Sequence, residues 1–536
     1  MTRRLWISLA MLVPGAGLLS TAALAGSSLK QGGIFRIGTT GASVQIDPQL
    51  AYVTTAWWLE YATAAKLYNY PERGALLRPE VASRFKVSNG GRTYTFFVRK
   101  GFKFSDGAPV TARNFAYAID RAVNKDLASP GAQFIIDSSG TEIVGARQVN
   151  DGQAKHVSGV RVKGNRLIIR LLRPDAAFLT KISMPFFQAT PTELPLTHEV
   201  TGSYPSAGPY AFTRNDVNVL TSLRRNPYYR RHRPHNLAGL DLQWNLNEQT
   251  AFEQVKANQL DEGPLPAAEV EAVARDYGVN KSRFWAMPTN CISYLAFNNQ
   301  RPLLGKVNMR KAINWAVDRT AFAGQAAAYS MTPWTHLLPP RFPGSVMTRR
   351  LQPYSVHPNL AKARRLAGGH VKGKRITVAY RSSGTINPAR AQLIRRDLIR
   401  LGFEPSHITM RGYSGADIYD AMGVHGSTID LGVPLGLCSD YPDPYAILGF
   451  FLDPFNPVGV DSLRYRVKVA RANALGPTAR IRALGKLDVE IMRNLAPAAV
   501  MGSYNNRYFF STRVAPRSLA WQPVYQDFSI PALALK

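Results

Sequence analysis

Two aspartates in one short loop are the residues whose type and spacing could do chemistry. Asp440 and Asp443 lie in residues 436–444, which read Gly-Leu-Cys-Ser-Asp-Tyr-Pro-Asp-Pro. A carboxylate held on a loop of a rigid scaffold can pair with a ligand's ammonium group, a contact worth roughly 1.5–3 kcal/mol. The same side chains could instead cap backbone groups of a turn. The residues alone leave binding and capping open.

The rest of the sequence contains no familiar catalytic pattern. There is no His-Glu-x-x-His, no Walker phosphate loop and no Gly-x-Gly-x-x-Gly after a predicted strand. Residues 412–416 approach a nucleophile elbow but lack its final glycine. His232 and His235 have a His-x-x-His spacing, but no carboxylate or thiolate lies near them in the sequence, which favours a surface loop. We therefore predict no catalytic residue, no metal site and no cofactor.

Short strands that alternate with helices must position these loops. Residues 92–98 and 166–171 are rich in strand formers, with period-two alternation in the first. Thr111 is a predicted helix cap, and apolar residues recur at helical spacing in three further segments. These predicted helices span 307–319, 389–401 and 478–492. Strands interleaved with helices predict an α/β fold.

The composition is that of a globular chain with a large basic excess. The 536 residues are 45% hydrophobic and 19% charged, which predicts two to four domains. The formal net charge is +31. Lys and Arg are spread along the chain instead of forming one arm, so we interpret them as a solvated surface and expect no nucleic-acid partner.

The first 25 residues have the pattern of a secretory signal peptide. Arg3 and Arg4 precede a largely apolar run over 5–19, and Ala-Leu-Ala at 23–25 is a small-x-small cleavage site. The run is short for a membrane anchor, the competing interpretation. Cleavage would remove two positive charges and leave 31 − 2 = +29. We expect an exported protein, soluble outside the cytoplasmic membrane, whose two cysteines, Cys291 and Cys438, could form one disulfide.

Several short motifs in a fixed order resemble the extracytoplasmic solute-binding proteins of peptide-type ABC importers. The resemblance covers nearly the whole chain after residue 25. The motifs include Ile-Asp-Pro at 46–48, Arg-Pro-Glu-Val-Ala-Ser-Arg-Phe at 78–85, Tyr-Thr-Phe at 94–96, Arg-Lys-Gly at 99–101, Phe-Ser-Asp-Gly at 104–107, Val-Thr-Ala at 110–112, Gly-Pro-Tyr at 208–210, Arg-Asn-Pro-Tyr-Tyr at 225–229, Tyr-Leu-Ala-Phe-Asn-Asn at 294–299, and the segments 307–313 and 317–319.

The resemblance implies a ligand site around Asp440. This residue matches an aspartate that grips a peptide's α-amino group, and Gly436 matches a glycine whose backbone meets the peptide. A disulfide between Cys291 and Cys438 is implied by a matching cysteine pair. Asp443 is interpreted as a turn cap. The predicted ligand-binding residues are Asp440, Gly436, Leu437, Cys438, Tyr441, Val53 and Thr54.

Two departures from the family pattern concern the specificity of this site. Leu437 replaces a tryptophan, which alters the aromatic wall, and Pro434 replaces an arginine that can meet a peptide carboxylate. Recognition of the amino end could therefore persist while the preference for length or for a carboxylate changes.

The resemblance also implies two hinged lobes and an inserted domain, an α/β periplasmic-binding-protein fold. The expected parts are a signal peptide at 1–25, lobe I at 26–70, 202–289 and 500–536, domain II at 71–201 and lobe III at 290–499. Ligand would lie between lobes I and III, which close by hinge motion and add the peptide as a strand.

Three functions remain open from the sequence. The first is a monomeric peptide receptor that delivers its ligand to an importer permease. The second is the same role for a metal chelate, a sugar or an anionic metabolite, which Leu437 and Pro434 keep open. The third is a secreted enzyme or a structural protein of the envelope, for which no catalytic cluster is found. Asp440 favours a ligand that carries an amine.

Overall fold

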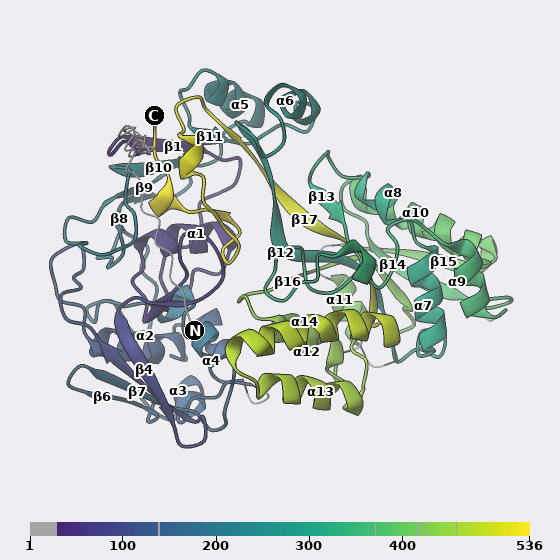
Figure 1. Ribbon diagram of the computed structural model, residues 1–536, viewed down its shortest axis with the longest axis horizontal. Coiled ribbons are helices and arrows are strands. Elements are labelled where there is room, and N and C mark those ends of the chain that lie inside the picture. The colour runs from purple at the N-terminus through teal and green to yellow at the C-terminus, as the bar shows by residue number, and fades with distance from the viewer. Residues whose placement is uncertain (1–28, 138–139, 370, 415–416, 425, 457) are drawn as a thin grey trace, which may run out of the picture.

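The computed structural model describes residues 29–137, 140–369, 371–414, 417–424, 426–456 and 458–536. Figure 1 shows two halves joined by long strands. The first half, on the left, holds β1 to β11, β18 and β19, and the second half, on the right, holds α7 to α14 and β13 to β16. The predicted signal peptide at 1–25 lies outside the described residues, as do positions 415 and 416 of the elbow-like loop. Within the described ranges, no helix is long and apolar enough to cross a membrane.

One sheet of eleven strands runs through both halves. Its middle strands, β12 (Phe284–Phe297) and β17 (Ala498–Phe510), pair antiparallel along most of their length, and an irregularity follows Pro288, between the part in each half. In spatial order the sheet consists of β15 (Ile408–Tyr413), β14 (Ile376–Arg381), β16 (Leu431–Cys438), β12, β17, β11 (Glu262–Gly263), β1 (Ile34–Gly38), β10 (Gly239–Gln243), β9 (Leu220–Arg225) and β8 (Tyr210–Asp216), with β13 (Met331–Pro333) attached to β17.

The first half is completed by residues that follow β17. The indole Nε1 of Trp58 donates to the carbonyl of Phe528 at 2.7 Å, and the Asn236 amide donates to the carbonyl of Ala532 at 3.0 Å. These contacts join early, middle and late parts of the chain in one body. Its further elements are α1 (Thr54–Thr63), α5 (Glu248–Lys256), α6 (Val270–Tyr277), β18 (Trp521–Gln522) and β19 (Asp527–Phe528).

A separate small antiparallel sheet lies at the bottom left of Figure 1. It contains both strands predicted near 92–98 and 166–171, and Tyr94, Phe96 and Val98 are buried on one face as their alternation predicts. The Thr111 side chain accepts from the Arg113 N–H and caps α2, as predicted. The sheet consists of β4 (Ala82–Ser88), β5 (Thr93–Val98), β7 (Arg166–Arg170) and β6 (Val160–Lys163). The same region contains α2 (Ala112–Ala122), α3 (Ala146–Asn150) and α4 (Phe178–Lys181), and β2 (Tyr68–Asn69) and β3 (Arg78–Pro79) form a separate two-stranded sheet.

Helices surround the strands of the second half. The helix predicted over 307–319 is wrong at its end, because α7 stops at Ala316 and the Asp318 side chain accepts from the Ala321 N–H to begin α8. The helices predicted over 389–401 and 478–492 are confirmed with slightly wider bounds. The helices are α7 (Val307–Ala316), α8 (Arg319–Ala323), α9 (Leu360–Ala367), α10 (Ile386–Leu401), α11 (Asp417–Gly423), α12 (Pro444–Leu452), α13 (Leu463–Asn473) and α14 (Pro477–Asn494).

Single 3-10 turns complete the described structure. They are η1 (Pro130–Phe134), η2 (Pro185–Phe187), η3 (Arg349–Leu351), η4 (Pro405–His407), η5 (Pro516–Ser518) and η6 (Ile530–Ala532). The interleaved strands and helices confirm the α/β prediction. The domain boundaries predicted from the sequence stay a prediction.

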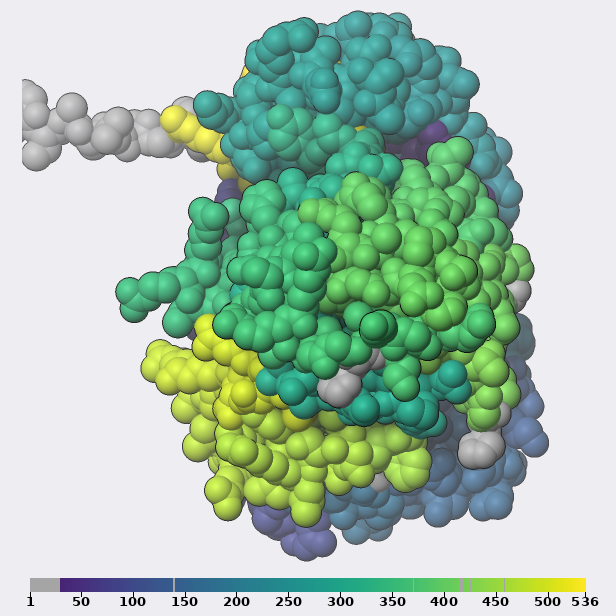
Figure 2. Space-filling model, turned by 90° about the vertical axis from the view of Figure 1, so that its right-hand side faces the viewer, coloured from purple at the N-terminus to yellow at the C-terminus, as the bar shows by residue number. Residues whose placement is uncertain are grey.

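The two halves also meet away from the long strands. Figure 2 looks onto the second half and places the yellow-green residues of α13 and α14 beside the blue and purple residues of the small sheet and its helices, as Figure 1 does. The Tyr441 ring, which follows β16, packs edge-on against Phe134 of η1 at 6.3 Å between centroids. The loop predicted to bind ligand therefore lies where the halves contact each other.

Candidate functional site

Strand β16 has one open edge. One side of it pairs with β12 from Phe297 to Cys291, whereas β14 covers the other side only from Leu431 to Val433. From Pro434 onward that second side has no strand partner among the described residues. An extended peptide can pair with an unpaired edge of this kind as an additional strand.

The hydrogen-bonding pattern between β12 and β16 determines which residues of β16 have main-chain groups that face the open edge. Cys291 and Cys438 lie opposite each other and form the disulfide that the resemblance implies. The Ser439 N–H donates to the Asn290 carbonyl at 3.2 Å, so the cysteines form a non-hydrogen-bonded pair of the antiparallel ladder. With a period of two, Cys438 and Gly436 direct their N–H and C=O groups away from β12, toward the open edge.

A pocket of about 140 Å³ joins the end of this edge to the first half. Val53 and Thr54, at the start of α1, line it together with Cys438 and Asp440. Four of the seven residues predicted to bind ligand therefore come together across the junction between the halves. The pocket, which we call the junction pocket, is lined by Tyr52, Val53, Thr54, Trp57, Cys438, Ser439, Asp440, Tyr525 and Gln526.

The Asp440 carboxylate has no cationic partner in the described part of the chain. Its Oδ1 accepts a hydrogen bond from the Tyr52 hydroxyl at 2.8 Å. Burial raises the pKa of Asp440, while the hydrogen bond from Tyr52 acts in the opposite direction. A carboxylate that is partly withdrawn from water and lacks a cation can gain by pairing with a ligand's ammonium group.

Gly436 and Leu437 lie outside the junction pocket but on the same strand. The Gly436 carbonyl accepts from the Tyr419 hydroxyl at 2.8 Å, and its N–H donates to the same oxygen at 3.1 Å. One hydroxyl thus satisfies both main-chain groups that face the open edge. Leu437 packs its side chain against the apolar core of the second half.

Tyr441 is the predicted residue that the structure turns away from the pocket. Its ring is 9% exposed and packs with the apolar core of the first half, and the Lys181 ammonium lies 5.7 Å from its centroid. Proline follows Tyr441 and restricts the backbone of the loop at this point. In this arrangement Tyr441 contributes to the contact between the halves.

Asp443 has the capping geometry predicted for it and a second contact that the sequence analysis missed. Its Oδ1 accepts from the Tyr445 N–H at 2.9 Å, at the start of α12. The same carboxylate pairs with both terminal nitrogens of Arg480 on α14, at 2.5 and 2.9 Å, and is 2% exposed. Asp443 therefore anchors the loop to α12 and α14, while Asp440 faces the pocket.

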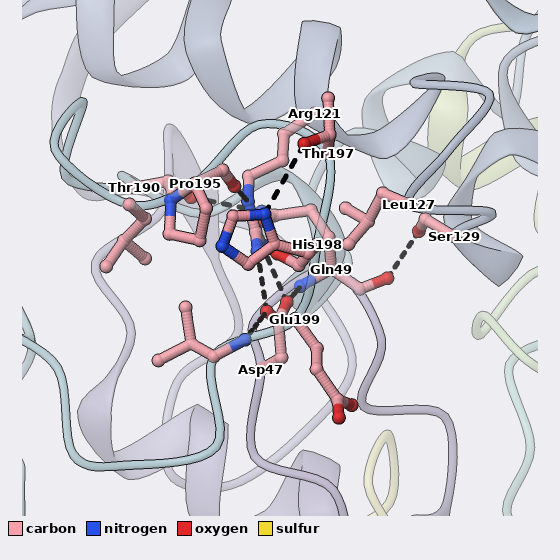
Figure 3. A network of polar contacts seen from close by, with 12 residues as sticks. Asp47, Gln49, Arg121, Leu127, Ser129, Thr190, Pro195, Thr197, His198 and Glu199 are labelled. Carbon is pink, nitrogen blue, oxygen red and sulfur yellow. Dashed lines mark hydrogen bonds and ion pairs between the residues drawn. The ribbon is translucent and has the colours of Figure 1, made fainter.

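A polar network holds the segment that leads into the pocket. Figure 3 shows Asp47, from the Ile-Asp-Pro motif, facing the Arg121 guanidinium on α2. Both side chains are fully buried, and two nitrogen–oxygen contacts of 2.6 and 2.7 Å join them. Gln49 also accepts from Arg121, and the Val200 N–H donates to Asp47 at 2.8 Å. The motif thus anchors the chain a few residues before Tyr52.

A second, larger cavity of about 440 Å³ lies beside the long strands. Thr55 and Asp527 line it and directly follow Thr54 and Gln526 of the junction pocket in the sequence. Burial raises the pKa of Asp527 to about 7, and that of the neighbouring Glu262 well above its usual range. The described residues contain no group of three or more His, Cys, Asp or Glu side chains arranged to hold a metal ion.

Sequence reasoning missed Tyr419 and five residues that line the junction pocket, which are Tyr52, Trp57, Ser439, Tyr525 and Gln526. Tyr52 precedes two predicted residues and could have been included on that ground. Tyr419 and Gln526 reach the site from distant parts of the chain, and no local pattern in the sequence marks them.

Comparison with known proteins places these features in a family. The model of bacterial extracellular solute-binding proteins, family 5 (middle part), matches residues 77–457. A probable deoxycholate-binding periplasmic protein, YgiS, of Escherichia coli is 27% identical over 368 residues, which cover 67% of each chain. The oligopeptide-binding protein OppA of Bacillus subtilis is 25% identical over 285 residues, about half of each chain.

Solved structures share the fold over almost the whole chain. The unliganded open form of the murein tripeptide-binding protein MppA superposes with a TM-score of 0.76 at 20% identity, over 95% of this chain and 98% of that one. The OppA of Haemophilus influenzae, solved in complex with the peptide RPPGFSPFR, gives a TM-score of 0.67 at 19% identity, over 95% and 99%. At these identities the likeness concerns the fold.

Proposed function

The chain belongs to family 5 of the bacterial extracellular solute-binding proteins, and from this premise we propose that it captures oligopeptides between its halves and delivers them to an ABC importer. The observation that carries the proposal is a strand edge at Gly436 and Cys438 that leads to the Asp440 carboxylate; among the described residues the edge has no strand partner and the carboxylate has no cation. A peptide in extended conformation would place its α-ammonium group at Asp440 and pair its main chain with that edge.

The surroundings of the site support a binding role in several ways. The junction pocket has walls from both halves, so relative motion of the halves would open and close it. The long strands β12 and β17 are the proposed hinge, with lobe I at 26–70, 202–289 and 500–536, domain II at 71–201 and lobe III at 290–499. No step of covalent chemistry is needed for capture and release. We further propose export by the segment 1–25 and action as a monomer with an importer permease as partner.

A second candidate ligand is an amphipathic anion. The name of the Escherichia coli relative YgiS indicates deoxycholate, and Leu437 stands where the family pattern has a tryptophan, which would leave a more aliphatic wall. In this alternative the basic excess of the chain would attract the solute, and Asp440 would not bind it directly. Binding should then weaken strongly as salt is raised.

Calorimetry with paired ligands tests the peptide proposal. Asp440→Asn keeps the shape of the side chain and removes its charge, so it should weaken binding of free-amine peptides by roughly 2–5 kcal/mol, because the ligand's ammonium group loses its partner. N-acetylated peptides should bind the unmodified protein poorly and lose little more in the variant. Asp461→Asn, the same change at an exposed carboxylate, is the matched control and should leave both affinities unchanged.

Equal affinity of the unmodified protein for free and acetylated peptides would contradict the assignment of Asp440. Mass spectrometry of solutes released from the gently denatured protein provides an independent test. Recovery of peptides supports the proposal, whereas recovery of a steroid-like anion and no peptide would support the second candidate.

A further inference from the structure

We propose that one end of the second half is a docking surface for a membrane that displays anionic lipid head groups. The surface is formed by six exposed cations where α9 and α10 end and where β14 begins. They are Arg364, Arg365, Lys372, Lys374, Arg375 and Arg400, and we call them the cationic end. This inference goes beyond the capture of a ligand and does not depend on which solute the protein binds.

Lys and Arg occur along the whole chain, but their excess over Asp and Glu is concentrated in one part of it. Residues 301–411 contain 20 Lys or Arg and three Asp or Glu, so this segment carries 20 − 3 = +17 of the formal net charge of +31. Residues 412–497, which follow in the second half before β17, contain eight Lys or Arg and nine Asp or Glu. The basic excess of the second half therefore lies in the part that runs from α7 to β15.

The carboxylates of residues 301–411 do little to balance its exposed cations. Asp318 is half-buried and caps α8, Asp397 is 1% exposed, and only Glu404 is exposed. Within the cationic end, Arg400 pairs with Asp397 at 3.7 Å. The other five cations form no ion pair with a carboxylate in the part of the chain that the structure describes.

Contacts among α9, α10 and β14 bring the six cations together at one end of the second half. The Arg364 guanidinium donates to the Arg400 carbonyl, with distances of 2.7 and 3.1 Å, which joins the last turns of the two helices. β14 begins at Ile376, directly after Arg375, and pairs in parallel with β15. Figure 1 places α9, α10 and β15 at the right-hand end of the molecule, and Figure 2 looks onto this end.

The ends of the two helices offset only a small part of this charge. The dipole at a helix C-terminus is equivalent to about half an elementary negative charge, so α9 and α10 together offset about one of the six positive charges. The remaining charges repel one another, which lowers the stability of the folded state. Positive charge that is unfavourable for the fold and is not balanced by the described residues favours an anionic partner outside the chain.

The lack of an apolar centre indicates the kind of partner. Among the described residues from 360 to 411, the one large apolar side chain that is exposed is Ile386, at the other end of α10. A protein interface has an apolar core, and binding of single-stranded nucleic acid uses exposed aromatic rings. Adsorption to an anionic bilayer requires neither, because each Lys or Arg near the head groups contributes by its charge. The cationic end therefore suits a lipid surface, to which it would bind without insertion.

The cationic end lies away from the candidate ligand site. β14 and β16 are parallel, and they run from this end toward Cys438, which ends β16 and lines the junction pocket. A bilayer at the beginning of these strands would leave the pocket, at the other end, accessible. Adsorption would thus concentrate the protein at a membrane without occupying its ligand site.

Co-sedimentation of the exported protein with vesicles tests the proposal. The protein should bind vesicles that contain phosphatidylglycerol, fail to bind pure phosphatidylcholine, and detach as salt is raised from about 0.05 to 0.5 M. The triple change Lys372→Gln, Lys374→Gln and Arg375→Gln should weaken binding to the anionic vesicles about 10- to 100-fold, because three charges near the head groups are lost. Thermal melts check that the variant is folded.

The matched control is the triple change Lys86→Gln, Arg161→Gln and Lys163→Gln. These residues are exposed on the small sheet of the first half, so the control loses the same side-chain types and the same net charge. It should bind the anionic vesicles as the unmodified protein does. Equal weakening in both triple variants would mean that net charge alone drives adsorption and would overturn the proposal. Two other results would also overturn it: displacement from the vesicles by free phosphate at matched ionic strength, or tighter binding of a DNA duplex than of vesicles through the same three residues.

Discussion

Asp47 and Asp440 show two ways in which this chain treats a carboxylate. Asp47 is fully buried and receives hydrogen bonds from both terminal nitrogens of Arg121 and from two backbone N–H groups. Asp440 faces a pocket, and from the described residues its carboxylate receives one side-chain hydrogen bond, from the Tyr52 hydroxyl. The first carboxylate is satisfied by the protein itself, so it maintains the fold. The second keeps unused capacity, which is what a ligand requires.

Removing Asp47 should have the largest effect on stability. Asp47→Ala leaves the Arg121 guanidinium buried without its counter-charge, so the free energy of unfolding should fall by about 3–5 kcal/mol. Asp440→Ala leaves no buried cation behind and should change it by less than about 1 kcal/mol. Urea unfolding of the two variants measures the difference. Similar losses in both would contradict the distinction between them.

Opening the disulfide tests how firmly the ligand edge is fixed. The bond between Cys291 and Cys438 closes a loop over a sequence separation of 147 residues and joins β12 to the end of β16. Replacing both cysteines by serine should lower the free energy of unfolding by about 2–5 kcal/mol, chiefly because the unfolded chain gains freedom. Chemical denaturation measures this loss. Non-reducing peptide mapping of the exported protein is the companion experiment, and two free thiols there would refute the bond.

The contribution of Asp527 to the free energy of unfolding depends on pH. Burial raises the pKa of Asp527 to about 7, and the nearby Glu262 shares this environment. The folded state therefore holds a proton that the unfolded state releases from about pH 4 upward. Stability from this group is fully present below pH 4 and is lost as the pH rises through about 7. Between pH 5 and pH 8 the free energy of unfolding should therefore decrease by an amount of the order of 1–2 kcal/mol, and Asp527→Asn should reduce this decrease. Denaturation curves at the two pH values measure it. An unchanged pH profile would exclude this role.

The smallest expected effect is that of Tyr52→Phe. The Tyr52 hydroxyl stabilises the ionised form of Asp440 and opposes the effect of burial on its pKa. Without the hydroxyl the pKa of Asp440 should rise further, and binding of a free-amine peptide should fail at a higher pH as the solution is acidified. Dissociation constants measured from pH 4 to pH 8 should show this shift, with a change of about threefold or less near neutrality. A shift toward lower pH would mean that Tyr52 does not act on the carboxylate.

The sequence predicted elements where a strong local pattern was present. The alternation of Tyr94, Phe96 and Val98 and the cap at Thr111 gave β5 and α2 correctly. The end of α7 was missed because Asp318, which suits a helix interior poorly, serves as the cap of the next helix. Local periodicity does not reveal such a change when the apolar spacing continues through it.

The site was predictable only in part, since its residues come from separate regions of the chain. The resemblance to a family indicated Asp440, Gly436 and the pairing of Cys291 with Cys438. The contacts of Tyr52 with Asp440, of Arg480 with Asp443 and of Tyr419 with Gly436 depend on how distant segments pack. Tyr441 was assigned to the ligand site by its neighbours in sequence, but its ring faces the opposite side of the loop.

The return of residues 511–536 to the first half has a consequence for the order in which the protein matures. Residues 290–504 contain the helices of the second half, the strands β13 to β16 and the parts of β12 and β17 that pair with them, so that half can fold as soon as this stretch has emerged. The first half must wait, because Trp58 and Asn236 find their partners only in Phe528 and Ala532, near the other end of the chain. During synthesis its apolar surfaces would remain uncovered for longest, which makes it the half most in need of protection from aggregation.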